Sequence, residues 1–254
     1  NVSTMACFVV AGAGVKVCKH GNRRASSTSG SFDLLDALGV AIELDGEAVA
    51  RCVADAGLGF CFARSFHPAM RHAGPVRAEL GVPTVFNFLG PLSNPARVQR
   101  QVIGVSLPSM ADIVVGVLQK RNAPRALVVH GHDEMDELTT TGPSTVNQVE
   151  DGVITMYELD PTDYGIPIVA AERVAGGDAE VNAAIARRVF GGEESPYSDI
   201  VVLNAAAGLW VSGTVPTLGD GIDAARASLD SGGAAAALER LVAVSSKLAA
   251  QSDG

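Results

Sequence analysis

The sequence predicts an α/β fold, with a mainly parallel central sheet, an antiparallel C-terminal addition to that sheet, and helices on both faces. Short apolar runs alternate with amphipathic segments along most of the chain, which is typical of parallel sheets. A composition of 47% hydrophobic residues with 28 glycines fits a well-buried core with tight turns, and 5% aromatic residues leaves aliphatic side chains to fill it. Asp151-Gly152 lies between two strand-like runs and predicts the antiparallel hairpin.

Local signals mark the elements of the first part of the chain. Residues 4–13 are apolar almost all round, as in a buried helix, and we expect Ser3 or Thr4 to cap it. We expect Asp45 to cap a later helix that Gly57 ends, because apolar residues recur at helical spacing between them. The elements expected up to residue 66 are helices over 4–13, 32–38 and 46–56 and strands over 15–18 and 58–63.

The remainder continues the alternation. Residues 67–95 carry several prolines and predict broken helices and turns. Ser109 is expected to cap a helix whose apolar side chains recur up to Leu118. The other expected elements are strands over 102–105, 126–129, 144–149 and 153–159 and helices over 178–190, 200–209, 222–228 and 234–248.

Charge and cysteine content exclude several classes. A net charge of −9 argues against a broad nucleic-acid footprint, although a local basic pocket stays possible. No apolar run approaches the roughly 20 residues of a membrane span, and no signal peptide is recognisable. The four cysteines lack C-x-x-C spacing and lie in apolar surroundings, which predicts reduced core thiols in a cytosolic protein.

Polar residues concentrate in one strand-to-helix connection, from Lys19 to Ser31. Such connections lie outside the carboxyl ends of parallel strands, where α/β sheets bind ligands. Glycines let the backbone approach a ligand, and the following helix offers free N–H groups to an anion. Lys19 can reach a pyrophosphate as a mobile point charge. We therefore expect a ligand that carries phosphates, a carboxylate or a sugar.

A second cluster is acidic and follows the strand expected at 126–129. Asp133, Glu134, Asp136 and Glu137 could hold Mg²⁺, which takes oxygen ligands and usually shares them with substrate phosphates. A solvated acidic loop explains the residues equally well.

Several motifs resemble one family. Lys-His-Gly-Asn-Arg at 19–23, followed by small residues, Ser-Ser and Ser-Gly, resembles the signature of the anthranilate phosphoribosyltransferases. Arg24 departs from it, since the family usually has a small residue there. The resemblance covers most of the chain. Its further motifs are Asn-Val-Ser-Thr at 1–4, Phe-His-Pro at 66–68, Gly-Val-Pro-Thr at 81–84, Asn-Phe-Leu-Gly-Pro-Leu-Ser-Asn-Pro at 87–95 and Asp-Glu-Leu-Thr-Thr at 136–140.

The resemblance implies Mg²⁺-dependent transfer of phosphoribosyl from phosphoribosyl pyrophosphate to anthranilate, in tryptophan biosynthesis. It implies a cytoplasmic homodimer that contacts through a small helical domain. Residues 1–66 and 96–254 would form the large α/β domain, and 67–95 part of the helical one. Family members also carry an N-terminal helical segment and a Gly-Thr-Gly-Gly-Asp loop ahead of the position of Asn1. We therefore expect this chain to be a piece of a longer protein, and poorly active without that segment.

The resemblance also assigns site residues. At the anthranilate site it implies His20, Asn22, His67, Arg77, Gly90 and Pro91. For phosphoribosyl pyrophosphate it implies Asn1, Ser3, Thr4, Lys19, Asn22, Ala25, Ser26 and Ser27. For the metal it implies Ser3, Asp136 and Glu137, which leaves Asp133 and Glu134 solvated. No residue is assigned as general base.

Simpler explanations and rival functions remain. His67 could be structural, as we expect for His72, His130 and His132, and Arg77 could pair with Glu79 at the surface. A pyrimidine nucleoside phosphorylase-like enzyme would share the fold, but it lacks the Lys-His-Gly-Asn loop and needs no carboxylate clamp. An inactive relative that binds nucleic acid or another ligand is the third alternative, which the net charge of −9 disfavours.

Overall fold

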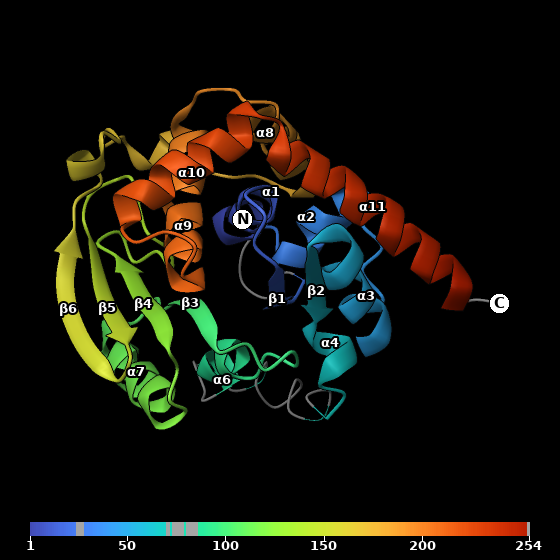
Figure 1. Cartoon of the computed structure of the whole chain (residues 1–254), viewed down its shortest axis with the longest axis horizontal. Helices are drawn as coiled ribbons and strands as arrows, with labels where there is room; N and C mark the ends of the chain where they lie inside the picture. Colours follow the sequence, from blue (N-terminus) through green and yellow to red (C-terminus); the bar gives the residue numbers. More distant parts are fainter. Residues whose placement is uncertain (24–27, 70–71, 73–78, 80–85, 253–254) are drawn as a thin grey trace.

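The computed structural model describes residues 1–23, 28–69, 72, 79 and 86–252. It confirms the α/β class, with parallel strand pairs, an antiparallel addition and helices on both sides (Figure 1). Where the sequence predicts one central sheet, the described strands form a two-stranded and a four-stranded sheet. Their order is β1 (Val17–Gly21) and β2 (Leu58–Phe62) in the first, then β3 (Arg100–Gly104), β4 (Arg125–Gly131), β5 (Ser144–Glu150) and β6 (Val153–Leu159) in the second.

Pairing within the sheets follows the sequence pattern. β1 runs parallel to β2, and β3 runs parallel to β4, whereas β4, β5 and β6 are antiparallel neighbours. The expected hairpin turn is present, with φ of 47° at Asp151 and 82° at Gly152. Two successive residues with positive φ are typical of the type I′ turn, whose twist matches that of the strands it joins.

The helices lie around and between the two sheets. In chain order they are α1 (Val2–Gly12), α2 (Ser31–Ala37), α3 (Gly46–Ala56), α4 (Ala63–Phe66), α6 (Phe86–Leu92), α7 (Ala111–Lys120), α8 (Ala179–Phe190), α9 (Pro196–Ser212), α10 (Leu218–Asp230) and α11 (Gly233–Ser252). Figure 1 shows α8 and α10 at the top of the molecule and α11 running down to the right, with β1 and β2 near the centre and β3 to β6 to their left. No helix among the described residues has both the length and the apolar character needed to span a bilayer.

The caps separate correct predictions from wrong ones. The Asp45 carboxylate accepts a hydrogen bond from the Ala48 N–H at 2.8 Å, and Gly57 ends α3 with φ of 87°, as predicted. Ser3 and Thr4 were wrong as caps, because α1 begins at Val2, two residues earlier than expected, and Asn1 occupies its N-cap position without a side-chain cap bond. Ser109 was also wrong, because a short 3₁₀ turn precedes α7.

The core packs against both faces of the four-stranded sheet. Along β4, Leu127 and Val129 join the main core, which includes α9, while Ala126 and Val128 join a smaller core beneath α7. Neighbouring side chains of a strand point to opposite faces, so this alternation places helices on both sides. The aromatic side chains that the structure describes gather in or against the main core, where Phe8 lies 5.8 Å from Phe60, measured between ring centroids.

Candidate active site

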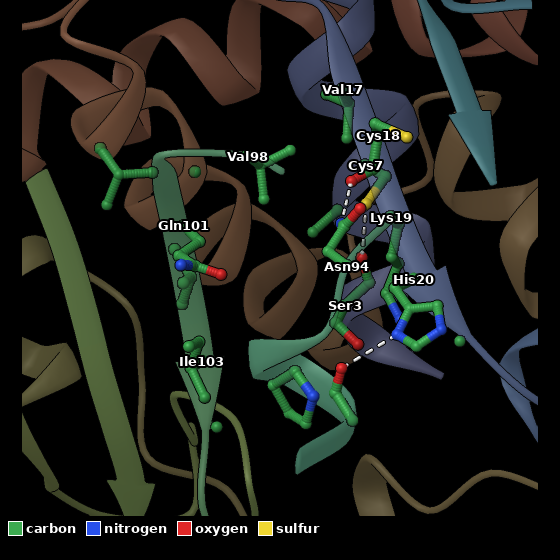
Figure 2. Close-up of a pocket in the computed structure, with 18 of the residues that line it drawn as sticks. Ser3, Cys7, Val17, Cys18, Lys19, His20, Asn94, Val98, Gln101 and Ile103 are labelled. Atoms are coloured by element: carbon green, nitrogen blue, oxygen red, sulfur yellow. Dashed lines mark hydrogen bonds between the residues drawn. The ribbon is translucent and has the colours of Figure 1, made fainter. Parts of the chain in front are cut away.

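A cavity of about 1430 Å³ lies between the two sheets, lined by β1, β3, α1 and α9. β1 and β3 are edge strands in the described part of the chain, and they face each other across the cavity in Figure 2. All five residues of β1 are therefore only half-buried, where the sequence predicted a buried strand. The lining includes residues at the carboxyl ends of β1 and β3, such as Gly21 and Gly104.

The carboxyl ends of the strands bring most predicted site residues together. They come from the start of α1, the end of β1 and the residue after it, the end of α4, α6 and the loop after β4. The predicted residues that line the cavity are Ser3, Lys19, His20, Asn22, His67, Gly90, Pro91, Asp136 and Glu137. Five separated segments thus converge where parallel sheets bind ligands.

The acidic loop caps α1. The Glu137 carboxylate accepts a hydrogen bond from the Ser3 N–H at 2.8 Å, so a side chain 134 positions away satisfies an N–H in the first turn. Burial raises the pKa of Glu137, and the nearby Asp136 carboxylate raises it further. The hydrogen bond from the Ser3 N–H acts in the opposite direction, but the pKa stays above its ordinary value. Thr4 is buried, and its hydroxyl has no hydrogen-bond partner among the described residues. It does not line the cavity.

The carboxylate pair suits a magnesium ion shared with a substrate. Asp136 is exposed to the cavity, and Glu137 is partly buried beside it. The described residues contain no group of three or more candidate protein ligands, so a cage made by protein alone is not formed there. Mg²⁺ usually keeps several waters and binds one or two carboxylates plus substrate phosphates, so this donor set fits it.

Gly104 lets this loop approach the sheet. A Cβ atom at Gly104, the last residue of β3, would collide with the backbone carbonyl of Asp136. Only glycine leaves room for that contact.

Asp133 was predicted wrongly as solvated. Its carboxylate accepts hydrogen bonds from the Thr139 and Thr141 hydroxyls at 2.8 and 2.6 Å and from the Met135 N–H at 3.3 Å. Burial raises its pKa, but these bonds outweigh that effect and hold the pKa below its ordinary value. Asp133 therefore organises the acidic loop. Glu134 is exposed, as expected.

Two histidines meet beside α6. The rings of His20 and His67 contact edge to face, with centroids 5.0 Å apart. Nδ1 of His20 lies 3.0 Å from the Gly90 carbonyl (Figure 2), while the Nε2 atoms of both rings are buried without a partner among the described residues. Burial lowers the pKa of His20; the Gly90 carbonyl opposes this effect, and His67 and Lys19 add to it. The neutral form is therefore favoured.

Asn1 lies outside the cavity lining and makes a polar contact instead. Its Nδ2 donates to the Ser29 carbonyl at 3.1 Å, and its Oδ1 accepts from Nδ2 of Asn182 at 3.2 Å. These bonds join the start of α1 to the loop before α2 and to α8. The predicted residues Ala25, Ser26, Ser27 and Arg77 lie outside the described residues, as does Arg24.

Arg23, the other cation of the Lys-His-Gly-Asn-Arg motif, pairs with carboxylates of α2. Arg23 pairs with Asp33 at 3.1 Å and with Asp36 at 2.8 Å, both on α2. Lys19 is thus the signature cation that lines the cavity in the described part of this loop.

Two asparagines were missed. Asn94 donates from Nδ2 to the Cys18 carbonyl at 2.9 Å and lines the cavity (Figure 2). Asn204 also lines it and bonds to Leu138, beside Glu137. A usable signal existed for Asn204, because it is the lone amide in the apolar run of 200–207.

Comparison with known proteins identifies the family. Residues 1–235 match the family model described as "Glycosyl transferase family, a/b domain". The chain therefore belongs to this glycosyl transferase family. A curated relative, the anthranilate phosphoribosyltransferase of Rubrobacter xylanophilus, is 53% identical over 98% of this chain and 73% of its own length.

Solved structures agree with this relationship. The anthranilate phosphoribosyltransferase of Thermus thermophilus matches with a TM-score of 0.90 and 48% identity, over 96% of this chain and 73% of that one. The Saccharomyces cerevisiae enzyme in complex with phosphoribosyl pyrophosphate and Mg matches with a TM-score of 0.89 and 30% identity, over 98% and 70%. The same yeast enzyme, in complex with 4-fluoroanthranilate, matches with a TM-score of 0.87 and 29% identity, over 98% and 70%.

Proposed function

We propose that this chain carries the catalytic α/β domain of an anthranilate phosphoribosyltransferase, which transfers phosphoribosyl from phosphoribosyl pyrophosphate to anthranilate. One observation carries the proposal. Lys19, the histidine pair and the acidic pair, from segments far apart in sequence, line one cavity at the carboxyl ends of the strands. Relatives about 50% identical over nearly the whole chain have this activity by name. The chemistry fits a donor with phosphates and an acceptor with a carboxylate.

The donor would lie between α1 and the acidic loop. Lys19, which lines the cavity, offers a point charge to the pyrophosphate. Asp136 and Glu137, with Ser3, would hold Mg²⁺, which when bound neutralises the charge of the leaving pyrophosphate. Asn1, Thr4, Ala25, Ser26 and Ser27 complete the proposed donor set. Asn1 and Thr4 would act from outside the cavity lining.

The acceptor would lie beside His20 and His67. Their unpaired, buried Nε2 atoms are free to hydrogen-bond the carboxylate or amine of an aromatic acid, and burial without a partner is costly. Gly90 and Pro91 of α6 would form one wall, and Asn22, which also lines the cavity, would lie near the amine and carboxylate. Arg77 would grip the carboxylate with its planar fork.

The reaction breaks the bond between ribose C1 and a pyrophosphate oxygen and forms a bond from C1 to the anthranilate nitrogen. C1 becomes oxocarbenium-like as the pyrophosphate leaves, and the amine then loses one proton. Most of the rate enhancement would come from residues that orient the two substrates toward each other and stabilise the developing charge. No side chain is assigned as the proton acceptor.

We further propose the domain and assembly that the resemblance implies. Residues 1–66 and 96–254 would be the large domain, and 67–95 a segment of a helical domain through which a homodimer forms. A cytoplasmic location is supported by the four free cysteines.

The test follows the loss of anthranilate fluorescence in this chain and in a form extended upstream through the glycine-rich loop. We expect the extended form to consume anthranilate only when phosphoribosyl pyrophosphate and Mg²⁺ are both present. If neither form consumes anthranilate, the proposal is contradicted. Phosphorolysis of thymidine or uridine instead would support the nucleoside phosphorylase alternative.

A further inference from the structure

We infer that Asn204 is a positioning residue that fixes the Asp136-Glu137 pair from outside its loop. The inference rests on the proposed function, because it concerns the residues proposed to hold Mg²⁺. Asn204 lies in the middle of α9, in an otherwise apolar stretch, and is 8% exposed. A buried amide is costly unless its donors and acceptor are paired, so its partners indicate its role.

Asn204 clamps both sides of one backbone unit. Its Oδ1 accepts from the Leu138 N–H at 3.0 Å, and its Nδ2 donates to the Leu138 carbonyl at 2.8 Å. The second Nδ2 hydrogen goes to the Ile200 carbonyl, at 2.9 Å, one turn back in α9. These contacts define the orientation of the amide, because a flipped side chain would place donor against donor and acceptor against acceptor at Leu138.

The clamped residue directly follows the carboxylate pair. Leu138 is fully buried, so its side chain anchors the loop in the main core while Asn204 defines the direction of its backbone. From there the chain leads back to Glu137, which reaches the Ser3 N–H at 2.8 Å. Asn204 thus acts on the acidic pair through one residue.

The other loop contacts act farther from this pair. The Thr139 N–H donates to the Ser144 hydroxyl at 3.0 Å, and the Thr139 hydroxyl donates to Asp133 at 2.8 Å. The first bond ties the loop to the start of β5, and the second holds the loop to itself. Asn204 ties it to a helix of the core.

α9 is a firm support for this clamp. At its C-terminal end, Arg100 donates to the Val211 carbonyl at 3.0 Å and Arg125 donates to the Trp210 carbonyl at 3.2 Å. Arg125 also lies over the Trp210 ring, with Cζ 4.9 Å from the ring centroid. Cations at a helix C-terminus stabilise it, and these two come from the first residues of β3 and β4. α9 is therefore fixed to the starts of β3 and β4 at its C-terminal end, and through Asn204 it holds the acidic loop, which follows the end of β4.

The test compares Asn204→Leu with Ser245→Ala. Ser245 is likewise a buried polar residue of a helix and accepts a hydrogen bond, from the Ala41 N–H at 3.1 Å, but it touches neither the acidic loop nor the cavity. Calorimetry measures Mg²⁺ binding in the presence of phosphoribosyl pyrophosphate, and hydrogen exchange of the Leu138 amide verifies that the clamp is broken. Asn204→Ala serves if Asn204→Leu does not fold.

We expect Asn204→Leu to weaken Mg²⁺ binding about 10–100-fold, as loss of partners that orient metal ligands commonly does. The KM for anthranilate at saturating Mg²⁺ should stay unchanged, and Ser245→Ala should bind Mg²⁺ normally. Suppose that Asp136→Asn or Glu137→Gln weakens Mg²⁺ binding but Asn204→Leu binds Mg²⁺ as well as Ser245→Ala does. The positioning inference is then overturned, while the proposed metal site stands. If neither carboxylate variant weakens binding, the proposed metal site fails, and the inference fails with it.

Discussion

The carboxylate of Glu137 accepts a hydrogen bond from the backbone N–H of Ser3 at 2.8 Å, and so joins the loop after β4 to the first turn of α1. The first N–H groups of a helix have no partner within the helix, and a carboxylate there also interacts favourably with the helix dipole. One side chain proposed to bind metal therefore also stabilises the helix start that would face the phosphates.

Glu137→Ala should destabilise the protein without any ligand present. Loss of a helix-capping side chain costs about 0.5–2 kcal/mol. Glu137→Gln keeps an oxygen acceptor for the Ser3 N–H and should cost less. Chemical unfolding of both variants in Mg²⁺-free buffer checks this. Equal losses of stability in the two would mean that the hydrogen bond contributes nothing.

His20 should titrate below its ordinary pKa of 6.5, since burial disfavours its charged form. The unfolded chain then binds more protons than the folded one in this window. Stability attributable to His20 is full above pH 6.5 and falls as the pH drops from 6.5 through the lower folded pKa. His20→Gln should flatten this part of the stability profile. An NMR midpoint for His20 at or above 6.5 would refute the shift.

Gly104→Ala should disturb the acidic loop, because its Cβ would collide with the Asp136 carbonyl. Overpacking costs about 1–3 kcal/mol, and we expect Mg²⁺-dependent binding to weaken along with stability. Gly116→Ala is the matched control: nothing lies within 4 Å of its Cβ, and the helix α7 around it should gain about 0.5–1 kcal/mol. Thermal unfolding of both variants measures the difference. Similar melting shifts for the two would contradict the contact.

The sequence predicted those features that local chemistry determines. Asp45 caps α3 and Asp151-Gly152 turns the hairpin, because a carboxylate cap and a type I′ turn need few residues. β1 was predicted over 15–18 from its apolar residues, but it spans 17–21, because Lys19 and His20 pair with Phe60 and Cys61 of β2. Pairing across sequence decided that boundary.

The candidate site was predicted in the same uneven way. The signature loop, the acidic pair and the shorter motifs around Ser3, His67 and Gly90 carry recognisable residues, and nine predicted residues line the cavity. The bond from Ser3 to Glu137 spans 134 positions, and the one from Leu138 to Asn204 spans 66, so neither has a local signal. Asp133 was read as solvated because its hydroxyl partners, Thr139 and Thr141, follow only after the chain has turned.

Arg77→Ala should raise the KM for anthranilate and spare that for phosphoribosyl pyrophosphate. Arg77 lies outside the described residues, so this prediction rests on the motifs around it. Losing a hydrogen bond to a charged group costs about 1.5–3 kcal/mol, or roughly one to two decades in KM. Steady-state kinetics with each substrate varied in turn provide the check. A defect selective for the phosphoribosyl donor would place Arg77 at the other subsite.

The most direct test of the account is calorimetric binding of phosphoribosyl pyrophosphate, with and without Mg²⁺, to the unchanged protein and to the Asp136→Asn, Glu137→Gln double variant. Both substitutions preserve side-chain shape and remove charge. We expect Mg²⁺-dependent binding in the unchanged protein and its loss in the double variant, with binding in the absence of Mg²⁺ similar in both. Unchanged Mg²⁺-dependent binding in the double variant would show that the acidic pair is merely solvated, and would contradict the proposed site.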